Sequence, residues 1–113
     1  MMRSILIAAV LALTATGVHA ASFNCARAKS ADERTICKTQ ALSDADVKMA
    51  TLYDVDTHLV AMGQRGDIQD AQADFLKTRK ACGKGTSCLK RAYDKRIKDL
   101  QDTFDAIASR GPF

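Results

Sequence analysis

The chain has 113 residues, of which 47% are hydrophobic and 27% are charged, and its formal net charge is +4 at pH 7. This length corresponds to one domain, and the absence of internal repeats and low-complexity tracts excludes a repeat array or a disordered chain. Nucleic acid is an unpromising partner, because a single aromatic residue, Tyr93, falls within the most basic stretch of the sequence.

Residues 1–20 have the features of a secretory signal peptide. Arg3 supplies a positive charge, residues 5–13 are almost wholly apolar, and the small residue Ala20 completes a signal-peptidase site. The apolar stretch is shorter than the roughly 20 residues that a membrane-spanning helix needs, and no second apolar span follows. We therefore expect residues 1–20 to be removed and residues 21–113 to form an exported domain, either periplasmic or secreted.

All four cysteines follow the expected cleavage site: Cys25, Cys37, Cys82 and Cys88. An even number of cysteines in a short exported chain is typical of disulfide bonds, although four cysteines permit three pairings. We expect Cys25–Cys37 and Cys82–Cys88, because the members of each pair are close in sequence and flank a predicted turn. A zinc site is disfavoured, since residues 21–113 contain a single histidine, His58, far from either pair. A redox site is disfavoured, since five residues separate Cys82 from Cys88 and no strands are predicted.

The first two predicted helices follow polar capping residues. The sequence SADE has the capping-box pattern, with Ser30 at the N-cap and Glu33 at N3, and predicts a short helix over residues 31–37. Ser43 is predicted to cap a second, longer helix that has an acidic first turn and ends near Gly63. The apolar stripe of this second helix comprises Val47, Ala50, Tyr53, Leu59 and Val60.

A third helix is predicted over residues 68–81, after a turn at residues 64–67. Its apolar positions are Ile68, Ala71, Phe75 and Leu76. Gly83 ends this helix, because glycine adopts the positive φ angles that a tight reversal of the chain needs. The segment from Cys82 to Cys88 is therefore expected to join two antiparallel helices, with its disulfide clamping one helix end to the next helix start.

A fourth helix carries the clearest apolar stripe of the sequence: Leu89, Tyr93, Ile97, Leu100, Phe104 and Ile107. This helix is capped by Thr86 or Ser87 and ends at Gly111-Pro112. Tyr53 and Tyr93 are expected in the core with their hydroxyl groups hydrogen-bonded. The sequence thus predicts an all-α fold, a small disulfide-stapled bundle of three to four helices in one domain.

Charge is unevenly distributed along the predicted domain. Residues 44–74 contain seven acidic residues and two basic ones, whereas residues 77–98 contain nine basic residues and one acidic one. The nine basic residues are Lys77, Arg79, Lys80, Lys84, Lys90, Arg91, Lys95, Arg96 and Lys98. Two interpretations are open: the opposite charges lie on solvated helix faces and partly neutralise each other, or the basic residues form an anion-binding patch around the loop at residues 82–88.

The sequence contains no pattern typical of an enzyme. A Ser-His-Asp combination, a metal-ligand cluster and a glycine-rich phosphate loop are all absent, so we expect no catalytic residue, no metal and no cofactor. Asp54 and Asp56 fall on different faces of the second helix, which argues against a paired-carboxylate site. Arg79 and Arg96 lie beside apolar positions, where an arginine serves a structural role at least as readily as a binding role.

Two groups of residues together form a recognisable pattern. The first group is Phe23-Asn24-Cys25-Ala26-Arg27-Ala28, Glu33, Ile36-Cys37, Leu42-Ser43, Asp46 and Tyr53. The second group is Phe75-Leu76, Arg79, Cys82-Gly83, Cys88-Leu89, Tyr93, Arg96-Ile97 and Leu100. This pattern resembles the lysozyme-inhibitor LprI-like domain family, and it covers essentially all of residues 21–113. The resemblance implies an exported helical domain of bacterial origin, and for some members of the family it implies binding and inhibition of lysozyme.

The resemblance makes the basic loop a candidate lysozyme-binding element. Lysozymes cleave glycan with two carboxyl groups that flank the scissile bond, and Lys84 at the tip of a rigid loop is the candidate group to pair with them. Arg79, Lys80 and Lys90 support Lys84 in this interpretation. The acidic second helix offers an alternative contact face through Asp44, Asp46, Asp54 or Asp56. The alternative function is a binding module for an anionic envelope glycan, a lipid headgroup or another envelope protein.

Overall fold

The computed structural model describes residues 20–111, which contain four α-helices, one short 3-10 helix and no β-strand. In chain order the elements are η1 (Cys25–Arg27), α1 (Ala31–Lys38), α2 (Gln40–Leu59), α3 (Met62–Cys82) and α4 (Thr86–Ala108). The predicted all-α fold is confirmed. Nearly all of the predicted signal peptide, and Pro112, lie outside the described residues. Within the described part of the chain, no helix combines the length and the apolar character that crossing a membrane requires.

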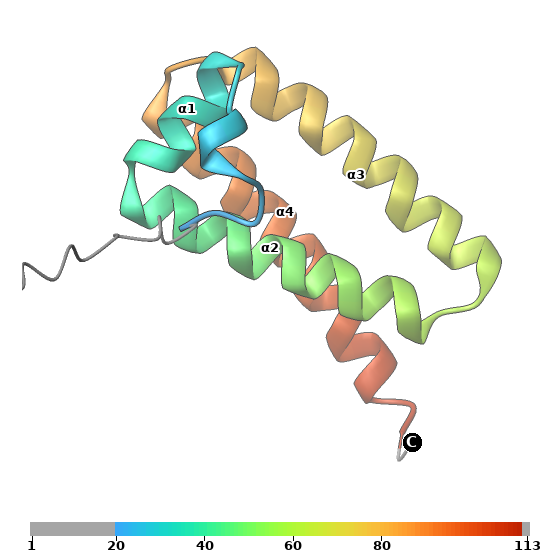
Figure 1. Ribbon diagram of the computed structural model, residues 1–113. Helices are drawn as coiled ribbons and strands as arrows, with labels where there is room; N and C mark the ends of the chain where they lie inside the picture. Colours follow the sequence, from blue (N-terminus) through green and yellow to red (C-terminus); the bar gives the residue numbers. More distant parts are fainter. Residues whose placement is uncertain (1–19, 112–113) are drawn as a thin grey trace, which may run out of the picture.

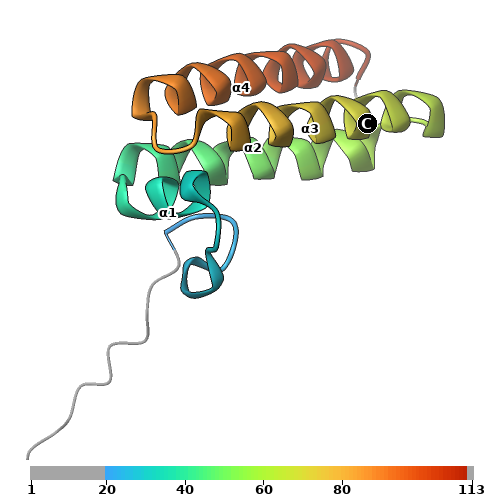
Figure 2. The same cartoon turned by 90° about the horizontal axis from the view of Figure 1, so that it is seen from above.

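Three long helices form the body of the molecule, and α1 lies at one end of it (Figure 1). Helix α3 runs antiparallel to α2, and α4 runs antiparallel to α3. Seen from above, α1 packs at the end where α3 connects to α4, beside the start of α2 (Figure 2). This arrangement brings the N-terminal third of the domain next to the loop at residues 82–88, although the two are far apart in sequence.

The core lies between α2 and α4 and is closed by α1 and α3. Buried apolar residues include Ile36, Leu42, Met49, Ile68, Phe75, Leu89, Tyr93, Leu100 and Ile107. The ring centroids of Phe75 and Tyr93 lie 5.2 Å apart in an edge-to-face arrangement. The stripe predicted for the fourth helix is confirmed, since its members are buried or half-buried. On α3, by contrast, only two of the four predicted positions are buried, and Ala71 and Leu76 are exposed.

The second helix begins at Gln40, upstream of the predicted cap residue Ser43. Thr39 alone separates α1 from α2, and its carbonyl oxygen accepts hydrogen bonds from the backbone N–H groups of Leu42 and Ser43. The buried Ser43 hydroxyl donates to the carbonyl oxygen of Ile36 at 2.7 Å. Ser43 therefore fixes the corner between α1 and α2 instead of capping a helix.

The turn predicted at residues 64–67 is wrong, because these residues and Gly63 already belong to α3. The chain turns earlier, around Val60. The Arg65 side chain accounts for this boundary: its Nε donates to the Thr57 carbonyl oxygen at 2.7 Å and its Nη2 donates to the Val60 carbonyl oxygen at 3.3 Å. These contacts satisfy carbonyl groups that the end of α2 would otherwise leave without partners.

The inward face of α2 also differs from the prediction. Val47 and Leu59, assigned to the apolar stripe, are 42% and 47% exposed. The face that packs against the core contains Leu42 and Met49 together with four buried polar residues: Ser43, Asp46, Asp56 and Thr57. Ala50, Tyr53 and Val60 of the predicted stripe do pack in or against the core. Because polar residues occupy so much of the inward face, the spacing of apolar residues alone identifies only part of it.

The predicted helix caps are partly right. Ser30 occupies the N-cap of α1, but its side chain makes no capping hydrogen bond, and the Glu33 carboxylate accepts from the Lys29 backbone N–H at 3.2 Å. The N-cap of α4 is Gly85, which precedes both of the hydroxyl residues predicted for that position. The C-terminal end of α4 is at Ala108, before the predicted stop.

Candidate functional site

Both expected disulfides are present. Cys25–Cys37 joins the segment before α1 to the last turn of α1, with the two Cα atoms 5.8 Å apart. Cys82–Cys88 joins the last residue of α3 to the first turn of α4, with Cα atoms 5.5 Å apart. The predicted pairings are therefore confirmed, and each disulfide constrains one side of the same end of the molecule.

The loop closed by Cys82 and Cys88 is short and tightly packed. Gly83 has a φ angle of 54°, which glycine adopts without strain. The Gly85 N–H donates to the Cys82 carbonyl oxygen at 3.0 Å, and a Cβ atom at Gly85 would lie 3.1 Å from that oxygen. Lys84 lies between the two glycines and is exposed. The loop thus presents Lys84 on a backbone that a disulfide and local hydrogen bonds hold in place.

Three of the four predicted partner-binding residues are exposed around this loop. Lys80 lies in the last turn of α3, Lys84 in the loop and Lys90 near the start of α4. The Lys90 Nζ atom donates to the Asp94 carboxylate at 2.6 Å. For Lys80 and Lys84, no carboxylate of residues 20–111 lies within ion-pair distance. These two lysines are therefore available to an external anion.

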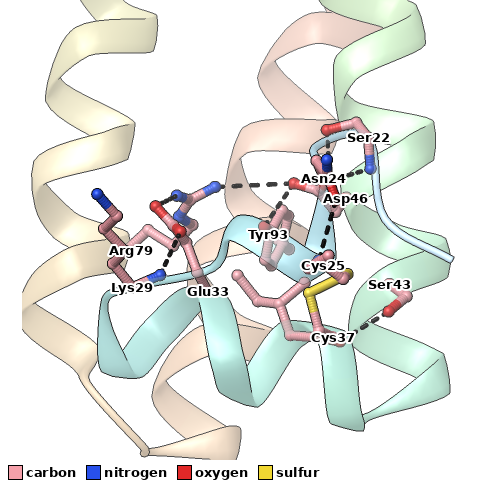
Figure 3. The surroundings of a disulfide bond; sticks show 12 residues. Ser22, Asn24, Cys25, Lys29, Glu33, Cys37, Ser43, Asp46, Arg79 and Tyr93 are labelled. Carbon is pink, nitrogen blue, oxygen red and sulfur yellow. Dashed lines mark hydrogen bonds and ion pairs between the residues drawn. A yellow bond between two sulfur atoms is a disulfide. The ribbon is translucent and has the colours of Figure 1, made fainter. Parts of the chain in front are cut away.

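Arg79, the fourth predicted residue, does not belong to this surface. Its side chain is 11% exposed, and its Nε donates to the Asp32 carboxylate at 2.8 Å. Its Nη1 lies 3.8 Å from Asp46 and its Nη2 lies 4.0 Å from Glu33. The guanidinium carbon also lies 5.4 Å from the ring centroid of Phe23. The geometry thus supports the structural interpretation of Arg79, as the cation of a buried charged cluster (Figure 3).

Asp46 is the centre of this cluster and is fully buried. The Tyr93 hydroxyl donates to Asp46 Oδ1 at 2.7 Å, and the backbone N–H of Ser22 donates to Oδ2 at 2.7 Å. The Ser22 hydroxyl also donates to Oδ2. Burial, together with the hydrogen bond to Asp46, raises the pKa of Tyr93 well above its ordinary value. Figure 3 shows the side chains of Ser22, Tyr93 and Arg79 converging on Asp46.

Asp32 completes the cluster and has a shifted pKa. It is 1% exposed. Burial alone would raise the pKa of its carboxyl group, but contact with Ser30 and the nearby charge of Arg79 outweigh that effect and lower it. The ionised form of Asp32 is therefore the form that the fold stabilises.

A second buried polar group lies further along the bundle. Arg96 on α4 donates to the Gln72 side-chain oxygen at 2.9 Å and to the Ile68 carbonyl oxygen at 3.1 Å, which ties α4 to α3. Asp56 on α2 is fully buried, and neither of its carboxylate oxygens has a hydrogen-bond partner among the described residues. Burial raises the pKa of Asp56 although the charge of Arg96 opposes the shift. Burial likewise lowers the pKa of Arg96.

Most basic residues of α4 are paired within their own helix. Lys90 pairs with Asp94, Lys95 with Asp99 and Lys98 with Asp102, each at 2.6 Å and each four residues apart. The solvated-face interpretation of the basic run therefore accounts for α4, although the partners are on the same helix and not across the bundle.

A different set of basic residues has no such partners. Arg34 and Lys38 on α1 are exposed at the same end of the molecule as the loop, and Arg91 is exposed in α4. No carboxylate of the described residues lies within ion-pair distance of them. We call this set the basic end: Arg34, Lys38, Lys80, Lys84 and Arg91. The two residues of α1 could not be found from the sequence, because only the packing of α1 beside the α3–α4 loop places them at this end of the molecule.

The acidic face proposed for α2 is only partly available. Asp46 and Asp56 are fully buried, whereas Asp44 and Asp54 are exposed. A partner therefore has access to two of the four predicted acidic residues. The spacing from Leu42 through Asp46 to Met49 is that of one helix face, and this position between two apolar residues is the signal that would have assigned Asp46 to the interior.

A groove lies beside the loop, so the surface near the basic end is concave there. Its volume is about 390 Å³, and its lining includes Thr39, Leu42, Thr86, Ser87 and Lys90. Among the described residues, no group of three or more His, Cys, Asp or Glu side chains has the arrangement of a metal site. What this end of the molecule offers chemically is fixed positive charge beside a groove whose lining includes hydroxyl groups and the Lys90–Asp94 ion pair.

Comparison of the chain with protein-family models, with curated proteins and with solved structures finds no match. The resemblance of the sequence to the LprI-like family stays a prediction, and the geometry of the basic end is the basis for a proposal of function.

Proposed function

We propose that this protein is an exported lysozyme inhibitor that binds its target through the basic end. The observation that carries the proposal is the contrast between two sets of basic residues. Lysines along α4 are paired with aspartates of the same helix, whereas the residues of the basic end have no carboxylate partner within the described chain. Lysozyme presents two carboxyl groups in its glycan-binding cleft, and unpaired cations on a narrow loop complement them.

The construction of the loop favours tight binding. The Cys82–Cys88 disulfide and the Gly85–Cys82 hydrogen bond hold the backbone around Lys84 before any partner arrives. A loop that is already ordered loses less conformational entropy on binding. A flexible loop with the same lysine would bind more weakly for this reason.

The start of α4 adds to the positive potential at Lys84. The N-cap residue, Gly85, provides no side-chain hydrogen bond, and the first turn of α4 contains no acidic residue. The positive end of the helix dipole is therefore uncompensated next to the loop. Both features favour an anionic group at this end of the molecule.

The test is an inhibition assay with the oxidised mature protein against c-type, g-type and i-type lysozymes. The double substitution Lys80→Ala/Lys84→Ala removes two unpaired cations, and we expect it to raise the inhibition constant at least about tenfold. Lys95→Ala/Lys98→Ala is the matched control, since it removes the same charge from positions already paired on α4. Inhibition that is unchanged by the first pair, or weakened equally by both pairs, would contradict binding through the loop.

A binding module for anionic envelope glycan is the second candidate, because the five exposed cations of the basic end have no carboxylate partner among the described residues. Binding through such a patch weakens steeply with salt, whereas insertion of a loop into a protein cleft is less sensitive. If no class of lysozyme is inhibited and binding to purified cell-wall glycan falls sharply between low and physiological salt, the second candidate replaces the first.

A further inference from the structure

The buried cluster around Arg79 holds more negative charge than positive charge. Three carboxylates approach it, those of Asp32, Glu33 and Asp46, and Arg79 is the one cation among the described residues that lies within ion-pair distance of them. The hydrogen bond from Arg79 goes to Asp32, whereas its contacts to Asp46 and Glu33 are 3.8 and 4.0 Å long. A buried carboxylate is costly unless a cation compensates it.

Of the two fully buried carboxylates in this cluster, Asp46 is the one that lies further from Arg79. It is fully buried, and its three hydrogen-bond donors are neutral groups: the N–H and hydroxyl of Ser22 and the hydroxyl of Tyr93. Two of these donors belong to the second residue of the predicted mature chain. The cluster therefore includes the residue next to the predicted N-terminus, where signal-peptide removal creates a new charged group.

Ala21 is the residue that cleavage after Ala20 would leave first. It is 6% exposed, and it directly precedes Ser22, whose backbone nitrogen lies 2.7 Å from the Asp46 carboxylate. Successive backbone nitrogens are separated by at most about 3.7 Å, so the nitrogen of Ala21 lies within about 6.5 Å of this carboxylate. Cleavage converts that nitrogen from an amide into an ammonium group.

We propose that signal-peptide removal completes the buried cluster: the new α-ammonium group of Ala21 becomes its second cation and pairs with Asp46. The proposal rests on cleavage between Ala20 and Ala21 and is independent of lysozyme inhibition. Cleavage then does more than release the protein, because it supplies a charge that the fold lacks. The Cys25–Cys37 disulfide holds the N-terminal segment in the position that this pairing requires.

The pairing has a defined pH dependence. The charged and titratable groups that face this position are Asp32 and Glu33 of α1, Asp46 of α2, Arg79 of α3, Tyr93 of α4 and Arg27 of the N-terminal segment. The carboxylates raise the pKa of an ammonium group, whose ordinary value is about 7.7–8.0. The stabilisation is complete below this ordinary range and is lost as the pH rises through the raised value.

The test compares the mature protein, beginning at Ala21, with the same protein acetylated at the Ala21 nitrogen. Ligation at Cys25 of a free or acetylated tetrapeptide gives both forms without modifying lysines. At pH 6 we expect acetylation to lower the ratio of folded to unfolded protein at least about tenfold, which corresponds to one unit of pKa shift. At pH 10 the two forms should differ by less than about twofold, since the free amine is then neutral.

The substitution Asp46→Asn is the partner variant. In the Asp46→Asn protein, acetylation should change the ratio of folded to unfolded protein at pH 6 by less than about twofold. The carboxylate that the ammonium group pairs with is then absent. Equal effects of acetylation with and without Asp46 would overturn the proposal. If the variant does not fold, titration of the Ala21 amine by NMR decides the question in the unmodified protein. A pKa within or below the ordinary range overturns the proposal, as does an exported protein whose first residue by mass spectrometry is not Ala21.

Discussion

Asp56 lies in the interior of the molecule with no hydrogen bond to either carboxylate oxygen among the described residues. Burial raises its pKa, so the folded state holds the Asp56 proton more tightly than the unfolded state does. The effect of Asp56 on the pH dependence of the free energy of unfolding therefore has the opposite sign to that of an ion-paired aspartate. The free energy of unfolding is reduced as the pH rises from the ordinary value of about 3.9 through the raised pKa, and it stays reduced at neutral pH.

We predict that Asp56→Asn raises the free energy of unfolding at pH 7 by about 1 kcal/mol, because an amide loses less solvation on burial than a carboxylate does. Urea unfolding at pH 7 and at pH 3 provides the measurement, and the gain should shrink at the lower pH. Asp54→Asn is the control, since that side chain is 75% exposed on the same helix. An equal gain from both substitutions would show that general charge reduction, and not relief of burial, is responsible.

Asp32, which pairs with Arg79, stabilises the fold in its ionised form, in contrast to Asp56. We predict that Arg79→Ala lowers the free energy of unfolding by about 3–5 kcal/mol, because Asp32 and Asp46 then remain buried without their shared cation. The pKa of Asp32 is lowered in the folded state, so its stabilising contribution exists above the ordinary value of about 3.9 and is lost as the pH falls through the lowered pKa. The cost of the substitution should consequently diminish in acid.

Thermal or urea unfolding of Arg79→Ala and of Lys80→Ala at neutral pH checks this prediction. Lys80 is adjacent in sequence but exposed, and its substitution should change the free energy of unfolding by no more than about 0.5 kcal/mol. Similar values for the two variants would mean that the Arg79 contacts contribute little to the fold.

At this scale the sequence allowed some roles to be predicted and not others. The burial of Tyr93 and the hydrogen bond of its hydroxyl follow from its place in a strong apolar stripe. The structural role of Arg79 was one of two interpretations that its position permitted. Asp32 and Asp56 could not be assigned to the interior, because charged residues are seldom buried and the charges that act on these two come from other helices. Arg79, which pairs with Asp32, and Arg96, whose charge acts on Asp56, lie 47 and 40 positions further along the chain.

At the scale of the helices, Gly66 and Gly85 differ in the space available for a side chain. Gly66 lies inside α3, and a Cβ atom there would meet no atom within 4 Å. Gly85 precedes α4, and a Cβ atom there would lie 3.1 Å from the Cys82 carbonyl oxygen and 3.3 Å from the Cys88 side chain. Gly66 is therefore a replaceable glycine within a helix, whereas a side chain at Gly85 would crowd the disulfide loop.

We predict that Gly66→Ala raises the free energy of unfolding by about 0.5–1 kcal/mol, since alanine is the better helix former. Gly85→Ala should lower it by about 1–3 kcal/mol, because the added methyl group displaces packed neighbours. Chemical denaturation of the two variants beside the unsubstituted protein measures both changes. Stabilisation by Gly85→Ala would indicate that the loop relaxes freely, and would remove the argument that it is preorganised for binding.

The helices themselves were predicted with unequal success for a physical reason. The fourth helix has an uninterrupted apolar stripe, so its existence and its inward face followed directly from the sequence, although its two ends did not. The boundary between α2 and α3 did not, since Gly63 and Gly66 resemble turn residues and the Arg65 contacts that fix the boundary depend on the finished fold. Helix-breaking propensity is a weak signal, and tertiary contacts override it here.

In the molecule as a whole, charge is segregated by the packing of α1. The sequence showed a basic stretch at residues 77–98, but much of that stretch is neutralised on α4 or buried with Arg79 and Arg96. Arg34 and Lys38 on α1 add two further unpaired cations at the end of the molecule where α3 connects to α4. The basic stretch at residues 77–98 and the basic end therefore share only some of their residues. A count of charges along the sequence records neither the burial nor the pairing of each side chain.

The distribution of the Arg79 cluster over the molecule has a consequence for which fold the chain selects. Its members come from the N-terminal segment and from all four helices, so all of these elements must be in their native positions before the cluster forms. A compact arrangement that buries Asp32 or Asp46 away from Arg79 leaves a carboxylate in the interior without this cation, which is costly. The cluster thus discriminates against compact misfolded forms, including those that the two other disulfide pairings would produce, even where its net contribution to stability is small.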